Sequence, residues 1–105
     1  MIFGYQIVKT AGDSMSPAIF DGAYLLIKRR NTYQTGDIVY VRHKRYGNIV
    51  KRIVSGDKKT GYYIDGDNIA SVSMMKMGIV EHVRIVGMVR MIINPSHDNN
   101  SLAKN

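Results

Sequence analysis

Several residue types and patterns are scarce or missing in this sequence, and each absence excludes a class of chemistry. It has no cysteine, so disulfides, thiolate zinc sites, iron–sulfur clusters and cysteine nucleophiles are excluded. Its three histidines, His43, His82 and His97, are scattered without HExxH spacing, so neither a metal nor a cofactor is predicted. No apolar run approaches the ~18 residues of a transmembrane helix, and no signal-peptide pattern follows the N-terminus. These absences predict a soluble, cytoplasmic protein with no membrane segment in this chain.

What is present indicates one folded domain with a basic surface. The length of 105 residues suits a single domain, and 45% hydrophobic residues suffice for a core. The net charge is +7, with basic clusters at residues 28–30, 42–45 and 58–59. Such charge can attract anionic partners, but short runs of this kind are more often solvated loop and strand-end residues.

Short apolar, β-branched segments alternate with Gly- and Asp-containing turn signals along the chain. The predicted strands are residues 6–10, 23–29, 37–43, 48–54, 62–65 and 83–93. Strand signals at this spacing predict a mainly β fold, a sandwich or barrel of short strands with at most one or two helical turns.

Helical signals are weak, and the C-terminal residues lack any period. Residues 16–20 could form one turn with Pro17 at its first position. Residues 69–80 are predicted to be a loop with one helical turn at most, whose methionines fill the core beneath it or form an adaptable contact surface. Residues 1–93 are expected to form the domain, and the polar residues 94–105 a disordered tail.

One candidate for chemistry is a serine in a tight turn, Gly12-Asp13-Ser14-Met15-Ser16-Pro17. Glycine lets backbone approach a substrate closely, and Pro17 disfavours a helical Ser16. Such a turn could present the Ser14 hydroxyl, although a serine in a turn is usually structural. The segment is not a GxSxG elbow, because Ser16 occupies the last glycine position.

The second candidate is Lys51, which lies in an apolar strand pattern. Alternate residues of a strand share a face, so Lys51 is expected between Ile49 and Ile53. Burial there disfavours the ammonium form and lowers the lysine pKa, which would make it a base near neutral pH. The alternative is a lysine whose amine reaches solvent. A serine–lysine pair is a known variant of the catalytic triad, but the sequence does not show that the two residues meet.

Three segments in order resemble the LexA and type I signal peptidase superfamily of serine–lysine peptidases. They are GDSMSPAIFDGAYLLIKR, TGDIVYVRHKRYGNIVKRIVSGD and GYYIDGDNIASVS, which resemble the nucleophile, lysine and Gly-Asp-Asn boxes. The match covers roughly residues 4–90. Within this superfamily, the sequence resembles small soluble signal-peptidase-like proteases and nickel superoxide dismutase maturation proteases.

The resemblance implies a serine endopeptidase with Ser14 as nucleophile and Lys51 as general base. It implies an extended peptide or protein substrate, held by β-addition between residues 12–14 and 48–51. The oxyanion and substrate-binding residues are then Gly12, Asp13, Met15, Asn48 and Ile49, with the Ser14 N–H as the first oxyanion donor and the Met15 N–H next.

The sequence departs from this pattern in two places. Many signal peptidases carry a hydroxyl two residues before the nucleophile, where this chain has Gly12. The Asp and Arg that typically continue the last box are also missing, so Ser71 or Ser73 is expected to support Lys51 instead.

Two other functions stay open at this point. One is an inactive LexA-like interaction module that forms a homodimer, motivated by the altered last box. The other is a basic β-barrel that binds single-stranded nucleic acid, motivated by the +7 charge and by tyrosines among basic residues. Nucleic acid is the less favoured partner, because tyrosine also suits strands for packing. These tyrosines are Tyr33, Tyr40, Tyr46, Tyr62 and Tyr63.

Overall fold

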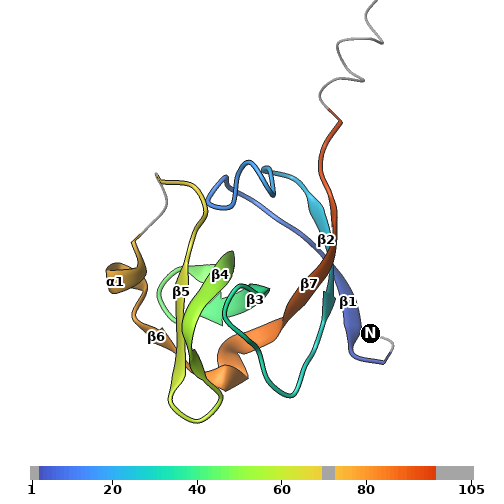
Figure 1. Ribbon diagram of the computed structural model, residues 1–105. Coiled ribbons are helices and arrows are strands. Elements are labelled where there is room, and N and C mark those ends of the chain that lie inside the picture. Colours follow the sequence, from blue (N-terminus) through green and yellow to red (C-terminus); the bar gives the residue numbers. More distant parts are fainter. Residues whose placement is uncertain (1–2, 70–72, 97–105) are drawn as a thin grey trace, which may run out of the picture.

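The computed structural model describes residues 3–69 and 73–96, and these residues form a mainly β fold, as predicted. One seven-stranded antiparallel sheet curls into a half-barrel (Figure 1). The strands are β1 (Tyr5–Lys9), β2 (Tyr24–Lys28), β3 (Ile38–His43), β4 (Gly47–Asp57), β5 (Gly61–Asp65), β6 (Ile79–Val80) and β7 (Ile85–Ile93). Helical structure comprises one turn, α1 (Met74–Met77), and the 3₁₀ turn η1 (His82–Arg84).

The strand order is β1-β2-β7-β3-β4-β5-β6, so the last strand lies in the middle of the sheet. β7 pairs with β2 on one side and with β3 on the other. Register shifts occur in both of these pairings and again between β4 and β5, where bulges help a sheet to bend. The curl brings the loop between β1 and β2 toward β4, although β4 is four strands away from β1 in the order.

Two apolar clusters form the core, one on each side of β4. Val50 belongs to the cluster that includes Met15 and Leu25, and Ile53 belongs to the one that includes Tyr62 and Met77. The central residues of β4 are therefore buried on both faces. The polar side chain of Lys51, between Val50 and Arg52, is withdrawn from bulk water.

Residues 69–80 contain more structure than the single turn expected there. Ser73 caps α1 by accepting a hydrogen bond from the Lys76 N–H, and Ile79–Val80 then pairs with β5 as β6. Met77 is buried, whereas Met75 is 84% exposed, so the two methionines have different environments. A two-residue strand is too short to leave a period in the sequence.

The segment after β7 begins with a residue that contacts the domain. Asn94 accepts a hydrogen bond from the Phe20 N–H at its Oδ1 (2.8 Å) and donates from Nδ2 to the Ala18 carbonyl (3.1 Å). Residues 97–105 lie outside the described residues. The division into a domain of residues 1–93 and a disordered tail therefore stays a prediction.

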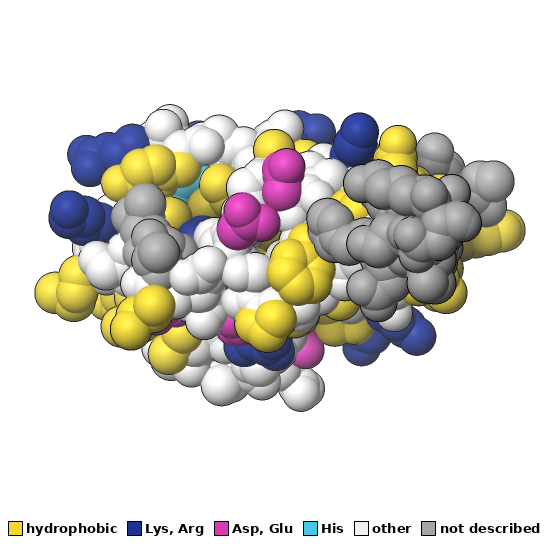
Figure 2. Space-filling view, turned by 90° about the horizontal axis from the view of Figure 1, so that it is seen from above, with side chains coloured by type: hydrophobic (Ala, Val, Ile, Leu, Met, Phe, Trp, Pro, Cys, Tyr) yellow, Lys and Arg dark blue, Asp and Glu magenta, His cyan; other side chains and the backbone are white. Residues whose placement is uncertain are grey.

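Positive charge is not gathered in one place on the face shown in Figure 2. Lys and Arg side chains lie mainly around its rim, and acidic side chains project nearer the centre. The net charge of +7 therefore does not by itself mark a binding face here. Among the described residues, the structure has no helix with the length and hydrophobicity needed to span a lipid bilayer.

Candidate active site

Ser14 begins a tight turn between β1 and β2, and carboxylates fix the path of the chain into it. Asp21 accepts the Gly12 N–H at Oδ1 (2.7 Å), and Asp13 accepts the Asp21 N–H (3.1 Å). Gly12 has φ +89°, in the left-handed region that favours glycine. The turn continues with a hydrogen bond from the Ile19 N–H to the Met15 carbonyl (2.9 Å), but this is an isolated turn, and the helical turn considered for residues 16–20 is not formed.

Asn68, from the segment after β5, holds this loop from the other side. Its backbone N–H donates to the Ser14 carbonyl (2.8 Å). Its side-chain Nδ2 donates to the Asp13 carbonyl (3.0 Å) and to Ser16 Oγ (2.9 Å). Asn68 therefore makes hydrogen bonds to three residues of the Ser14 loop, Asp13, Ser14 and Ser16.

Replacing Asn68 by alanine is expected to loosen the Ser14 loop. Both side-chain hydrogen bonds are lost, and at about 0.5–1.5 kcal/mol each the free energy of unfolding should fall by about 1–3 kcal/mol. Urea denaturation of wild type and Asn68→Ala measures the change. Asn48→Ala is a control on exposed β4. Equal stability of the Asn68 variant and wild type would show that these bonds do not hold the loop.

Lys51 lies in β4 opposite Val39 and is only 3% exposed. It shares a face with Ile49 and Ile53, as the strand period predicts. Burial lowers the pKa of the Lys51 amine below its ordinary value, and the negative charge of Asp65 opposes this shift more weakly. Lys51 is therefore closer to the neutral form, in which it can accept a proton, than an exposed lysine is.

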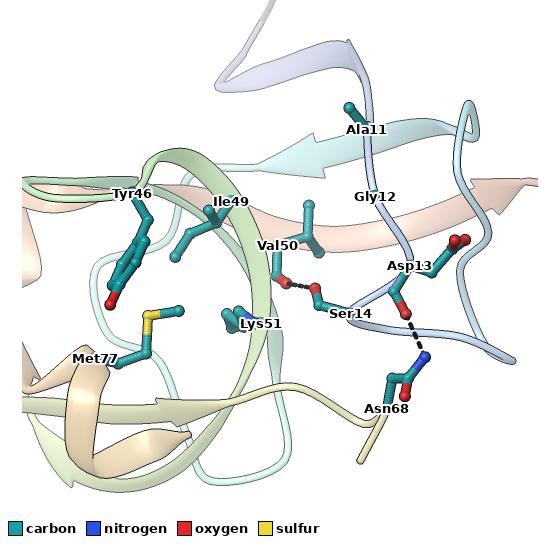
Figure 3. Close-up of a pocket in the computed structure, with 10 residues that line it drawn as sticks. All are labelled: Ala11, Gly12, Asp13, Ser14, Tyr46, Ile49, Val50, Lys51, Asn68 and Met77. Atoms are coloured by element: carbon teal, nitrogen blue, oxygen red, sulfur yellow. Dashed lines mark hydrogen bonds between the residues drawn. The ribbon is translucent and has the colours of Figure 1, made fainter. Parts of the chain in front are cut away.

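Ser14 and Lys51 line the same pocket, which has a volume of about 440 Å³ (Figure 3). The Ser14 hydroxyl donates to the Val50 carbonyl at 3.4 Å, directly beside Lys51 in β4. Lys51 Nζ has no hydrogen-bond partner within residues 3–69 and 73–96. Every fully buried side-chain nitrogen in these ranges has a partner, so Lys51 Nζ is not fully buried. The tip of Lys51 therefore reaches the pocket.

The sequence matches the family described as Peptidase S24-like over residues 4–90. The chain belongs to the peptidase S24-like family. This confirms the resemblance to the LexA and signal peptidase superfamily, and it supports a peptidase-like or LexA-like module. The search of curated proteins found no match.

The S24-like fold brings some of the predicted site residues together and leaves others apart. Gly12, Asp13 and Ile49 line the pocket with Ser14 and Lys51. The Met15 side chain lies beneath it, 2% exposed, and its sulfur accepts the Asp67 N–H. Asn48 is exposed on β4 and does not line the pocket.

The predicted lysine support is only partly covered by the described residues of this S24-like chain. Ser71 lies outside them. Ser73 is exposed, and its hydroxyl oxygen accepts the Lys76 N–H as the cap of α1. Support of Lys51 by either serine stays a prediction.

Sequence reasoning missed residues 65–68 as part of the site. Asp65 is the acidic residue whose charge acts on Lys51, and Asn68 holds the Ser14 loop. Between them, Asp67 forms a two-pronged ion pair with Arg52 (2.9 and 2.7 Å), whose third nitrogen donates to the Gly36 carbonyl. The Gly-Asp-Asn box was the available signal. This box carries the resemblance to the peptidase family, but its sequence alone does not indicate that Asn68 positions the Ser14 loop.

No group of acidic or histidine side chains in the described ranges is arranged to hold a metal ion. The polar side chains that line the Ser14 pocket are instead those of Ser14 and Tyr46, which have hydroxyls, Lys51, which has an amine, Asn68, which has an amide, and Asp13, which has a carboxylate. The Ser14 hydroxyl and the Lys51 amine therefore lie in one pocket.

Proposed function

We propose that this protein is a serine endopeptidase that cleaves extended protein or peptide segments with a Ser14–Lys51 dyad. The observation that carries the proposal is Lys51, a residue only 3% exposed whose amine has a lowered pKa and which lines the pocket that also holds Ser14. A hydroxyl becomes an effective nucleophile when a neighbouring base takes its proton. Membership of the peptidase S24-like family supports this assignment.

The proposed reaction begins when the Ser14 hydroxyl turns from the Val50 carbonyl toward the neutral Lys51 amine. The present hydrogen bond to that carbonyl is long, at 3.4 Å, so little is lost in the turn. Lys51 Nζ accepts the hydroxyl proton while Ser14 Oγ attacks the substrate carbonyl carbon. The resulting Lys51 ammonium gives this proton to the leaving amine. Water, deprotonated by Lys51, then hydrolyses the acyl-enzyme ester and regenerates the Ser14 hydroxyl.

The backbone at Ser14 supplies candidate donors for the oxyanion. In the described part of the chain, neither the Ser14 N–H nor the Met15 N–H has a hydrogen-bond acceptor. Backbone donors fixed in place by the surrounding fold stabilise a developing oxyanion without reorganising. The bonds from Asn68 to the Asp13 and Ser14 carbonyls hold these peptide groups in place.

The substrate backbone is proposed to pair with the first half of β4. β5 pairs with β4 only from Arg52 to Asp57, so residues 47–51 have no described strand on that side. The Val50 carbonyl points to this open side, since it accepts from Ser14, and the backbone of Asn48 follows the same alternation. Asn48 would thus act through its backbone. The apolar wall formed by Tyr46, Ile49 and Met77 would receive a substrate side chain.

The proposal is tested by incubating the protein with a library of unstructured peptides and identifying the cleaved bonds by mass spectrometry. A peptidase of this kind should cut a small set of peptides at one sequence pattern, with an apolar residue at a fixed position. A library left intact at micromolar enzyme would count against the proposal. So would cuts with no shared pattern, which indicate a contaminating protease.

The rate of cleavage is expected to rise with pH through the lowered pKa of Lys51. The base must be neutral to act, so activity is present above this pKa and lost below it. Asp65→Asn removes the charge that raises the Lys51 pKa, so its profile should lie at lower pH than the wild-type profile. The measurement is kcat/KM from about pH 5 to pH 10.

Glu81→Gln is the matched control for Asp65→Asn, because Glu81 is an exposed acid paired with Lys44. Its profile should coincide with that of wild type. If the pH profile of Asp65→Asn coincides with that of wild type, or lies at higher pH, Lys51 is not the titrating base.

A second candidate is an inactive interaction module that self-associates. The observation that favours it is the Ser14 hydroxyl, which is bonded to the Val50 carbonyl, while Lys51 Nζ has no partner among the described residues. Under this function the chain should dimerise and leave the peptide library intact. Sedimentation that finds only monomer at high concentration would exclude it.

A further inference from the structure

A second cavity of about 440 Å³ shares no lining residue with the Ser14 pocket. It lies among β1, the loop after β2, β3, and η1 with the start of β7. Its apolar lining includes Ile85 and Val86, and Tyr33 also lines it. The polar and charged lining residues are Gln6, Arg29, Arg30, Asn31, Arg42 and His82.

The three arginines of this cavity have no anionic partner in the part of the chain that the structure describes, and no described Asp or Glu lines the cavity. Within the described residues, no hydrogen bond or ion pair involves the guanidinium of Arg29, Arg30 or Arg42. Glu81, next to His82 in sequence, pairs with Lys44 instead at 3.6 Å. Three like charges around one cavity repel one another, and a bound anion would relieve this repulsion.

Asn31 adds a donor and brings a fourth cation to the cavity. Its Oδ1 accepts a hydrogen bond from Lys58 Nζ at 3.3 Å, so the Asn31 Nδ2 group remains to donate. The charge of Lys58 also lowers the pKa of His82, second to the effect of burial. Lys58 therefore adds positive charge beside Asn31 and His82, two residues that line the cavity.

We propose that this cavity binds a compact phosphate-bearing ligand, either free pyrophosphate or the phosphate chain of a nucleotide. A guanidinium offers a planar fork that matches two phosphate oxygens, and a phosphate has oxygens enough to engage several forks together. A single carboxylate presents one planar edge and one charge, which leaves most of the three arginine charges unbalanced. A volume of about 440 Å³ also lies in the range of small-molecule sites.

A single nucleic-acid strand fits the same charges less well. Strand binding relies on exposed aromatic side chains that stack on bases. Tyr33 is 4% exposed and Tyr62 is fully buried, and they meet edge to face in the core at 6.2 Å between ring centroids. These two tyrosines therefore pack the core beneath the cavity and offer no stacking surface. This inference uses neither Ser14 nor Lys51 and does not depend on the proposed peptidase activity.

The test compares two triple variants of the full chain by isothermal titration calorimetry with pyrophosphate and with ATP. One variant carries Arg29→Gln, Arg30→Gln and Arg42→Gln. The control carries Lys9→Gln, Lys76→Gln and Arg90→Gln, which lowers the net charge equally but outside the cavity. The cavity variant should weaken binding at least tenfold, and the control less than about threefold. Circular dichroism checks that both variants are folded.

Each outcome decides the question. Tighter binding of ATP than of pyrophosphate, with the same loss in the cavity variant, identifies a nucleotide, and equal binding identifies free phosphate groups. The proposal is overturned if wild type binds neither ligand at low salt. It is also overturned if both triple variants weaken binding equally, or if only an oligonucleotide binds, because the charge then acts as a diffuse field.

Discussion

Replacing Ser14 by alanine is expected to reduce the cleavage of any substrate peptide by at least about 10⁴-fold, while the protein stays folded. The hydroxyl is the proposed attacking group, and neither Asn68 nor Lys51 can replace it. Ser14 is only partly buried, and within residues 3–69 and 73–96 its side chain makes one hydrogen bond, the 3.4 Å contact with the Val50 carbonyl. Its loss should change the free energy of unfolding by about 1 kcal/mol or less. Cleavage of a peptide found in the library screen and urea denaturation measure the two effects.

Ser16→Ala is the matched control for Ser14→Ala. Ser16 lies two residues further along the same loop, and its hydroxyl accepts a bond from Asn68 Nδ2. Its removal should lower activity only several-fold through a looser loop. If Ser14→Ala cleaves as fast as wild type, Ser14 is not the nucleophile. If both serine variants lose activity equally, the loop and not one hydroxyl controls the rate.

The strands were predictable from sequence because their signal is local. Alternation placed Lys51 on one face with Ile49 and Ile53, and the structure has that arrangement. It also places Val50 in the opposite apolar cluster, so β4 is buried on both faces. If only one face of β4 were buried, as a simple alternating pattern predicts, the side chains of Val50 and Arg52 would be exposed to solvent. The sequence gives no local signal for that second cluster, which comes from the loop after β1 and from β2.

The strand order was not predictable, because β7 lies between β2 and β3. The pairing of Leu25 with Ile92 joins residues far apart along the chain, and nothing in either strand specifies its partner. The proximity of Ser14 to Lys51 depends on this order and on the curl of the sheet. For this reason the sequence predicts that Ser14 and Lys51 lie together only through the resemblance to the peptidase family, and not through the spacing of the residues.

The role of residues 65–68 could be found only with the fold in view. In the sequence, Asp65-Gly66-Asp67-Asn68 reads as a turn rich in polar residues. In the structure it links β4 to the Ser14 loop, since Asp67 pairs with Arg52 and Asn68 binds Asp13 and Ser14. An asparagine that hydrogen-bonds to three distant residues through its side chain and its backbone looks the same in sequence as an asparagine in solvent. The absence of the Asp and Arg of the family pattern therefore does not predict which residues fix the position of the Ser14 loop.

Replacing Lys51 by methionine is expected to abolish cleavage, by at least about 10³-fold, and at the same time to make the fold more stable at neutral pH. Methionine keeps a similar volume but has no proton acceptor and no charge to desolvate. Burial lowers the Lys51 pKa in the folded state from 10.5, so the unfolded chain binds more protons between the lowered pKa and 10.5. Wild-type stability therefore rises with pH across this window. The methionine variant lacks this dependence, and its advantage should shrink toward pH 10.5.

Thermal unfolding of both proteins at neutral pH and near pH 10, together with peptide cleavage, measures these effects. Lys51→Arg should be equally inactive, because a guanidinium stays protonated, but less stable than Lys51→Met, because its charge remains buried. Lys76→Met is the control on exposed α1, where neither stability nor its pH dependence should change. A Lys51→Met variant that is inactive but less stable than wild type at neutral pH would mean that the Lys51 amine is charged and partnered in the fold. It would then be an electrostatic anchor for the loop, and a base for Ser14 would have to be found elsewhere.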